Sequence, residues 1–150
     1  MSDYSDLIFL TAAMVVFGML TINTARSFQT TSDTMIRSDL EYRAIAIAQD
    51  EIDAIRWIQA RSKNGPKVPM DPFDPNNNNF LYDDNPIQKT ITYGSSGQYS
   101  ETFSVNREAE LLENTTDQRT YKITVTVESS AVNPPLSVSL DFIRTLTFEN

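Results

Sequence analysis

The sequence predicts an α+β protein with one long N-terminal α-helix, the C-terminal half of which packs on an antiparallel sheet of about four strands. Three observations predict this class. An uncharged apolar run near the N-terminus leads into a segment of helical period, a loop rich in Pro and Asn follows, and alternating apolar and polar residues fill most of the remaining chain.

Composition excludes several classes of function. The chain has 150 residues, about the size of one domain, with 12 basic and 20 acidic residues and neither His nor Cys. Thiolate nucleophiles, Ser–His triads and the usual structural zinc sites are therefore excluded. A net charge of −8 argues against binding the phosphate backbone of a nucleic acid. Carboxylate pairs such as Asp83–Asp84 have no nucleophile nearby in the sequence, so we expect no enzyme.

The apolar run from Leu7 to Ile22 contains sixteen residues without a charge. As a helix it spans roughly 24 Å, a little less than the ~30 Å hydrocarbon core of a bilayer. A helix on the surface of a soluble protein carries a polar stripe, and this run has none. We therefore expect lipid or other apolar helices around it. A secretory signal peptide fits poorly, because the residues before the run include Asp3 and Asp6 and no Lys or Arg.

The charges beside this run leave two interpretations of its orientation. The nearest basic residue is Arg26, so the positive-inside rule places the polar part of the chain in the cytoplasm. Alternatively, a short basic leader was removed and the numbering begins at the processed chain. The long helix that follows favours the second interpretation.

A helical period continues behind the apolar run. Residues 23–61 contain no Gly or Pro, and i,i+4 pairs such as Asp33–Arg37 lie on one face. The other face has apolar or small residues in steps of three and four: Ile36, Leu40, Ala44, Ile47, Ala48, Ile52, Ile55 and Ile58. The pattern predicts a single helix from about Ser2 to Ala60, followed by the stop signal Asn64-Gly65-Pro66.

A loop rich in Pro and Asn, Lys67–Asn85, is expected to have no regular structure and to connect this helix to the strands. Alternation predicts strands over residues 87–93, 99–105, 121–128 and 136–148, and a short helical turn is expected at Glu108–Leu112. A sheet with one apolar face needs a cover, and the helical stripe of residues 36–58 supplies it. We expect residues 1–28 to be an apolar helix half and residues 29–150 to be the α+β domain.

Two groups in and around the connecting loop have alternative interpretations. Asp74, Asn76 and Asn78 have the spacing that starts a calcium loop, but the expected Gly and bidentate Glu are missing. A solvated polar loop without a cofactor is favoured over calcium binding. The aromatic residues either form an exposed adhesive patch or, as we favour, pack the loop on the domain. They are Trp57, Phe73, Phe80, Tyr82 and Tyr99.

With these features the sequence resembles the type IV pilin superfamily of pilins, minor pilins and pseudopilins. The apolar run Leu7–Ile22 and the helix behind it carry the resemblance, together with the stretch Arg43–Arg56, which is similar to the Ala-rich helix of many minor pilins. Family members usually have Glu at position five and Pro near position 22. In this sequence Ser5 and Ile22 occupy these two positions, which indicates a divergent branch of the superfamily.

The resemblance implies a structural subunit of an extracellular pilus-like filament, associated with adhesion. Its partners would be identical subunits in a helical homopolymer and, before assembly, inner-membrane lipid. Assembly would involve Met1, Asp3, Asp6, Leu7, Phe9, Val16, Phe17, Gly18 and Leu20. Helix softening on assembly would involve Gly18, Thr21, Asn23 and Thr24. The alternatives are a minor pilin or pseudopilin of a pilus or type II secretion machine, and a single-pass membrane-anchored binding domain.

Overall fold

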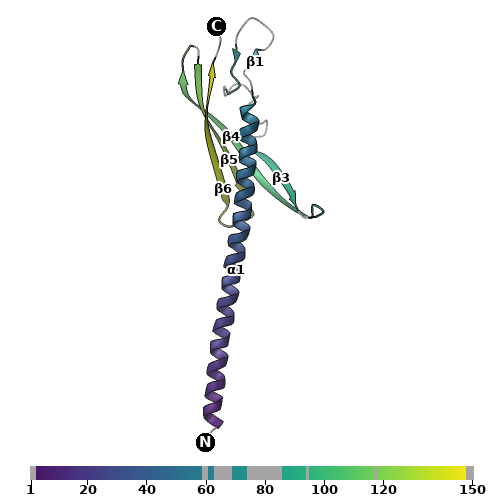
Figure 1. Ribbon diagram of the computed structural model, residues 1–150, viewed down its shortest axis with the longest axis vertical. Coiled ribbons are helices and arrows are strands. Elements are labelled where there is room, and N and C mark those ends of the chain that lie inside the picture. The colour runs from purple at the N-terminus through teal and green to yellow at the C-terminus, as the bar shows by residue number, and fades with distance from the viewer. Residues whose placement is uncertain are drawn as a thin grey trace. The chain divides into compact units, whose positions relative to one another are not determined.

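A single long helix and a four-stranded antiparallel sheet make up the fold, which confirms the predicted α+β class. The computed structural model describes residues 3–58, 61–62, 69–73, 86–93, 95–116 and 118–147. Helix α1 spans Asp3–Arg56 (Figure 1). The strands are β1 (Arg61–Ser62), β2 (Pro69–Met70), β3 (Ile87–Tyr93), β4 (Tyr99–Asn114), β5 (Gln118–Ser129) and β6 (Leu136–Thr147).

The chain divides into two units, the first ending at Asp39 and the second beginning at Leu40. In the first unit the described residues form the N-terminal part of α1. The second unit contains the remainder of α1 and all six strands. The predicted boundary after residue 28 stays a prediction.

The main sheet has the simplest antiparallel order, β3-β4-β5-β6, so each strand pairs with its neighbour in the sequence. Ile123 in β5 lies opposite Ala109 of β4 and Phe142 of β6, which puts these three residues on one face. At the turn between β3 and β4, Gly97 has a φ of 66°, a conformation that glycine adopts without steric cost.

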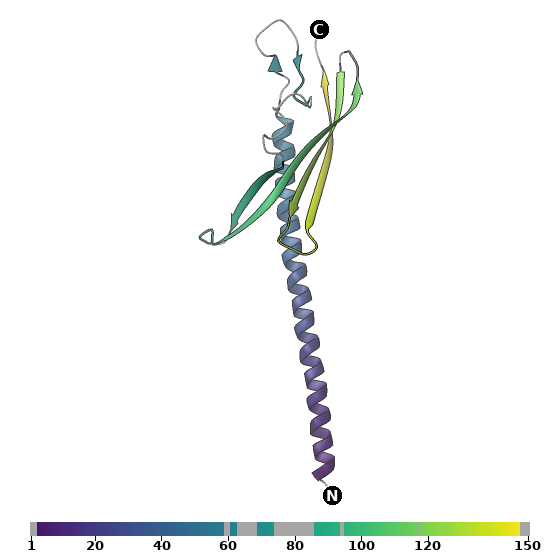
Figure 2. The same ribbon diagram turned by 180° about the vertical axis from the view of Figure 1, so that it is seen from behind.

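In the second unit, α1 covers one face of the sheet. Figure 1 shows α1 in front of the strands, and in Figure 2, seen from behind, β4 crosses in front of α1. Buried helix residues follow the predicted steps: Leu40, Ala44, Ile47, Ala48, Ile52 and Ile55. They pack on the inward residues of the strands, chiefly Phe103, Val105, Ile123, Val125 and Val127. Ile36 was predicted to belong to this cover, but it is exposed because the stripe begins at Leu40.

The opposite face of the sheet is polar. Hydroxyl side chains of neighbouring strands pair across it, as in Thr90–Thr102 at 3.0 Å and Thr120–Thr145 at 3.2 Å between oxygens. Threonine suits a solvated strand face because its branched side chain favours extended backbone. Among the described residues of this face, Ile143 is the exposed large apolar side chain.

The helix ends earlier than predicted, at Arg56, where Arg144 of β6 donates hydrogen bonds to backbone carbonyl groups at and just beyond its C-terminal end. The guanidinium donates to the backbone oxygens of Ile55 and Ile58, both at 2.6 Å. Carbonyl groups of the last helical turn have no partner within the helix, and a cation there also interacts favourably with the helix dipole. This contact explains why one charged residue occupies the apolar face of β6.

Two local predictions were wrong. The expected helical turn at Glu108–Leu112 lies within β4, which pairs with β5 as far as Asn114 and has an irregularity between Leu111 and Glu113. Pairing along the whole strand outweighs the helical preference of these few residues. Within the predicted irregular loop, β2 pairs with β1 through Pro69 and Met70.

Removing residues 1–28 is expected to leave a soluble, monomeric domain with a single cooperative unfolding transition. The sheet keeps its helical cover, since its buried part begins at Leu40, so no large apolar patch is uncovered. Light scattering coupled to size-exclusion chromatography would give the mass, and circular dichroism would follow thermal unfolding. Aggregation or a gradual transition would show that the apolar segment belongs to the folded domain.

Candidate functional site

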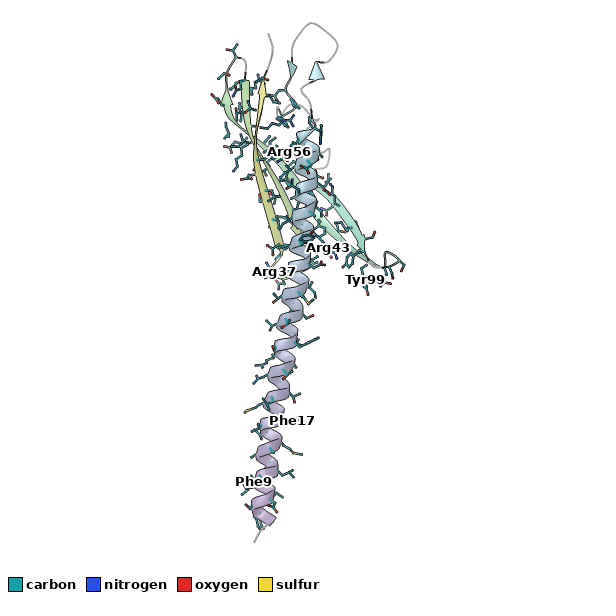
Figure 3. The ribbon with its side chains drawn as sticks, in the orientation of Figure 1. Phe9, Phe17, Arg37, Arg43, Arg56 and Tyr99 are labelled. Atoms are coloured by element: carbon teal, nitrogen blue, oxygen red, sulfur yellow. The ribbon has the colours of Figure 1, made fainter. Side chains whose placement is uncertain are left out.

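The first unit exposes an apolar helical surface on all sides. From Leu7 to Ile22 every residue is exposed apart from Gly18, which is half-buried. Phe9 and Phe17 are each 73% exposed (Figure 3). This helix is long and apolar enough to cross a membrane. Exposed apolar surface on this scale marks contact with lipid or with other protein chains.

The polar groups of this segment are satisfied within the helix. The Thr11 hydroxyl donates to the backbone oxygen of Leu7 at 2.7 Å, and Thr21 does the same to Phe17 at 2.9 Å. An unpaired hydroxyl in an apolar environment is costly, whereas a hydroxyl bonded to the preceding turn is not. The helix can therefore enter lipid or a layer of packed helices without leaving these hydroxyls unpaired.

The structure places the predicted assembly residues on this one surface. Leu7, Phe9, Val16, Phe17 and Leu20 are all exposed on it, and Asp6 is exposed next to its N-terminal end. Asp3 begins α1, and Met1 lies outside the described residues. The predicted softening segment Gly18–Thr24 is helical in the single chain.

A long apolar N-terminal helix whose C-terminal part covers a four-stranded antiparallel sheet is compatible with a pilin-like architecture. Comparisons with family models, curated proteins and solved structures find no match. The resemblance therefore depends on this architecture and on the residues of the N-terminal helix.

A buried cluster of charges, which sequence reasoning missed, joins α1 to the sheet. Glu51 of α1 accepts hydrogen bonds from Lys89 of β3 and from Arg107 of β4, with Arg107 Nε at 2.9 Å from Glu51 Oε2. The side chains of Glu51 and Arg107 are only 3% and 10% exposed. Lys89 and Arg107 both occupy inward positions of their strands. The alternation of apolar and polar residues along these strands could have indicated that a buried acidic residue lies opposite them. The cluster fixes α1 against two strands.

A second buried carboxylate, Asp71, ties the segment before the main sheet to β5. Its side chain accepts from the Tyr121 hydroxyl at 2.5 Å, from Arg119 Nη1 at 2.9 Å and from the backbone N–H of Phe73 at 2.9 Å. Phe73 is buried with its ring 5.5 Å from that of Tyr121, as expected for packing of the loop on the domain.

The candidate calcium residues are not among the groups that the structure describes. Asp71 is engaged with Tyr121 and Arg119, and no group of three acidic side chains able to hold a metal occurs among the described residues. The candidates Asp74, Asn76 and Asn78 lie outside the described residues, as do Phe80 and Tyr82.

Two of the predicted aromatic residues are exposed. Trp57 is 82% exposed at the end of α1, and Tyr99 is 55% exposed at the start of β4. The ring of Tyr99 stacks on Tyr93 at 5.5 Å between centroids, and the Arg43 guanidinium lies 4.0 Å from the centre of the Tyr93 ring. Figure 3 shows Arg43 on α1 and Tyr99 near the β3–β4 turn. These contacts brace the hairpin against the helix.

Burial and the hydrogen bond to Asp71 raise the pKa of Tyr121 to about 12. The folded state therefore favours the protonated phenol. Its contribution to stability is complete below the unfolded pKa of about 10 and is lost as the pH rises through 12.

The wild-type protein is expected to lose stability between pH 10 and 12, because the phenol of Tyr121 ionises more readily in the unfolded state. Replacing Tyr121 with Phe is expected to remove this part of the loss. Urea unfolding at several pH values would measure it, and absorbance of the phenolate would follow the titration directly. The control is Tyr42→Phe, since Tyr42 is exposed on α1. Identical pH profiles for the two variants would contradict the prediction.

Proposed function

We propose that the protein is the structural subunit of an extracellular type IV pilus-like filament and polymerises through its apolar N-terminal helix. The exposed apolar surface of Leu7–Ile22 supports this proposal, because none of the described residues of its own unit covers it. The second unit has a core of its own, formed by the buried part of α1 from Leu40 onward and the inward residues of the strands.

Burial of apolar surface supplies the driving force for assembly. Each square ångström removed from water contributes about 25 cal/mol, and every added subunit repeats the gain. Contacts between different surfaces that do not close into a ring produce a helical filament. Before assembly the same segment is held in membrane lipid, where its length of roughly 24 Å needs only slight thinning of the bilayer.

Minor pilins and pseudopilins would use the same helix in fewer copies per filament, so the fold does not distinguish them from a major subunit. A membrane-anchored binding domain would use the helix only as an anchor, and apolar helices of this length serve that role in other proteins as well.

Electron microscopy of sheared surface filaments, combined with mass spectrometry of their subunit, tests the proposal. Filaments composed mainly of this chain are expected. Recovery of the chain only as a minor component would support the pseudopilin or minor-pilin role. Recovery only from membranes, as a monomer in detergent, would overturn the filament in favour of the anchored domain.

Helix α1 is expected to become extended or kinked between Gly18 and Thr24 on assembly. Gly in a helix interior costs roughly 1 kcal/mol relative to Ala. A Cβ at Gly18 would meet no atom within 4 Å, so packing inside the chain does not require this glycine. The hydroxyls of Thr21 and Thr24 already bond to backbone oxygens and compete with the helical ladder.

The measurement is a filament map together with a Gly18→Ala, Asn23→Ala variant, which is expected to form stiffer filaments with altered subunit spacing. Unbroken helical bonding from Leu7 through Arg37 in the filament would contradict the prediction. In that case Gly18 serves the alternative role of allowing close approach of a neighbouring helix.

A further inference from the structure

A second apolar pattern runs along α1 through its polar half. We propose that this face pairs in parallel and in register with α1 of a second copy of the chain. The inference deepens the proposed assembly role, because it names the face and the partner through which two subunits first associate. We call this face the heptad seam: Phe17, Thr21, Thr24, Phe28, Thr31 and Met35.

The spacing of these residues alternates between four and three, a mean period of 3.5 residues. That period keeps one stripe facing a partner helix when two helices coil around each other. Continued along the sequence, the same steps reach Ser38, Tyr42 and Ile45 in the second unit. A pattern maintained over so many steps is specific to a helical partner and is not required for contact with lipid.

The large side chains of the seam are uncovered in the single chain. Phe28 is 74% exposed and Met35 is 73% exposed, although both stand in a segment that is otherwise rich in hydroxyl and charged residues. In the second unit Tyr42 and Ile45 are exposed, whereas Leu40 and Ile47 are buried against the sheet. The seam positions there belong to the helix face that the sheet leaves uncovered.

The threonines of the seam turn their hydroxyls onto their own helix. The Oγ1 atoms of Thr24 and Thr31 each lie 2.9 Å from the backbone oxygen four residues earlier. With the hydroxyl engaged, the methyl group is left as the contact surface. Small residues with satisfied hydroxyls also allow two helices to approach closely.

The charges of this segment avoid the seam. Arg26 and Asp33 fall at the heptad position directly opposite it, and Leu40 at the next such position is buried under the sheet. In a parallel, in-register pair, the positions that flank the seam bring Ser27 of one copy close to Ser32 of the other. In the same way, Thr34 of one copy lies close to Asp39 of the other. No like charges meet across the contact, so a second copy of α1 is an electrostatically compatible partner.

Cysteine cross-linking of the full-length chain tests the seam, since the chain has no cysteine of its own. The variant Thr31→Cys places the thiol on the seam. Thr30→Cys is the matched control, because Thr30 makes the same type of hydrogen bond at 3.0 Å but lies off the seam. In liposomes under mild oxidation, Thr31→Cys is expected to form covalent dimer about ten times faster, because a disulfide needs Cα atoms within ~7 Å.

A second pair of variants tests whether the apolar residues drive the contact. Adding Phe28→Ala and Met35→Ala to Thr31→Cys is expected to slow dimer formation severalfold. Adding Ile36→Ala, which removes an exposed apolar side chain beside the seam, is expected to leave the rate unchanged. Equal rates for Thr31→Cys and Thr30→Cys, or no effect of the seam substitutions, would overturn the inference.

Electron microscopy of the wild-type chain separates this inference from the proposed function. Filaments without the cross-linking difference would overturn the seam and leave the filament proposal intact. Cross-linking at Thr31 without filaments would support the seam and count against the filament.

Discussion

Replacing Glu51 with Gln is expected to lower the free energy of unfolding of the second unit by about 3–5 kcal/mol. The substitution removes the negative charge that Lys89 and Arg107 share, and Arg107 has little access to water. The buried guanidinium of Arg107 would then face a neutral amide, while Lys89, whose side chain is 37% exposed, keeps contact with water. Urea unfolding of the full-length chain in detergent, followed by circular dichroism, would measure the change.

Asp50→Asn is the matched control for this substitution, because Asp50 is the preceding residue and is exposed. It is expected to change stability by less than about 0.5 kcal/mol. Combining Glu51→Gln with Arg107→Met should recover part of the loss, since the buried cation that had faced Glu51 is removed. Equal effects of Glu51→Gln and Asp50→Asn would show that the buried cluster contributes little.

Replacing Asp6 with Ala is expected to abolish filament formation or reduce it severely while the second unit stays folded. The resemblance to pilins implies that the α-amino group of Met1 enters the apolar layer of the filament, where an unpaired charge is very costly. A carboxylate on an adjacent subunit is the natural partner. Asp6 borders the apolar run directly and is exposed, so it is placed ahead of Asp3 for this role.

Filament yield by electron microscopy and folding by circular dichroism would be measured on the same preparations. Asp33→Ala serves as the control, because it removes an acid from the polar half of α1 without touching the apolar run. Normal yield from a double Asp3→Ala, Asp6→Ala variant would refute the pairing.

Periodicity in the sequence was sufficient to predict the helix and four strands, although β4 continues to Asn114, well beyond the predicted end at residue 105. The spacing of apolar residues along the sequence indicates which face of an element they occupy. An element with one buried face shows a period of 3.6 residues if it is a helix and 2 residues if it is a strand. Ile123, Val125 and Val127 alternate in the sequence and are all buried in β5. The same rule correctly placed Leu40, Ala44 and Ile47 under the sheet.

The contacts of charged side chains were harder to predict, because they join residues far apart in the sequence. Glu51 reaches Arg107 across 56 positions, and Arg144 reaches Ile55 across 89. The end of α1 depends on that last contact, whereas local signals pointed to Asn64-Gly65-Pro66. A charged residue at an inward strand position is the available signal, since burial requires a partner for it.

The candidate site was proposed from a different signal. Its residues are exposed along the described part of α1, and their apolar character is visible in composition alone. Which molecules surround Leu7–Ile22 depends on contacts with other molecules. For that reason the assembly residues are a prediction from pattern and exposure, and the experiments above address them directly.

The inward direction of the side chains of Lys89, Arg107 and Arg144 affects the electrostatic interaction between neighbouring molecules. Lys89, Arg107 and Arg144 direct their charges toward Glu51 and the end of α1, so they add little to the outer electric field of the second unit. On the outer sheet face, Glu108, Glu110 and Glu128 are exposed. In the proposed filament, these acidic faces of neighbouring subunits repel one another, and at an ionic strength of 0.1 M this repulsion is screened beyond about 10 Å. Lateral clustering of the molecules should accordingly increase with salt, whereas apolar contacts between their helices should persist.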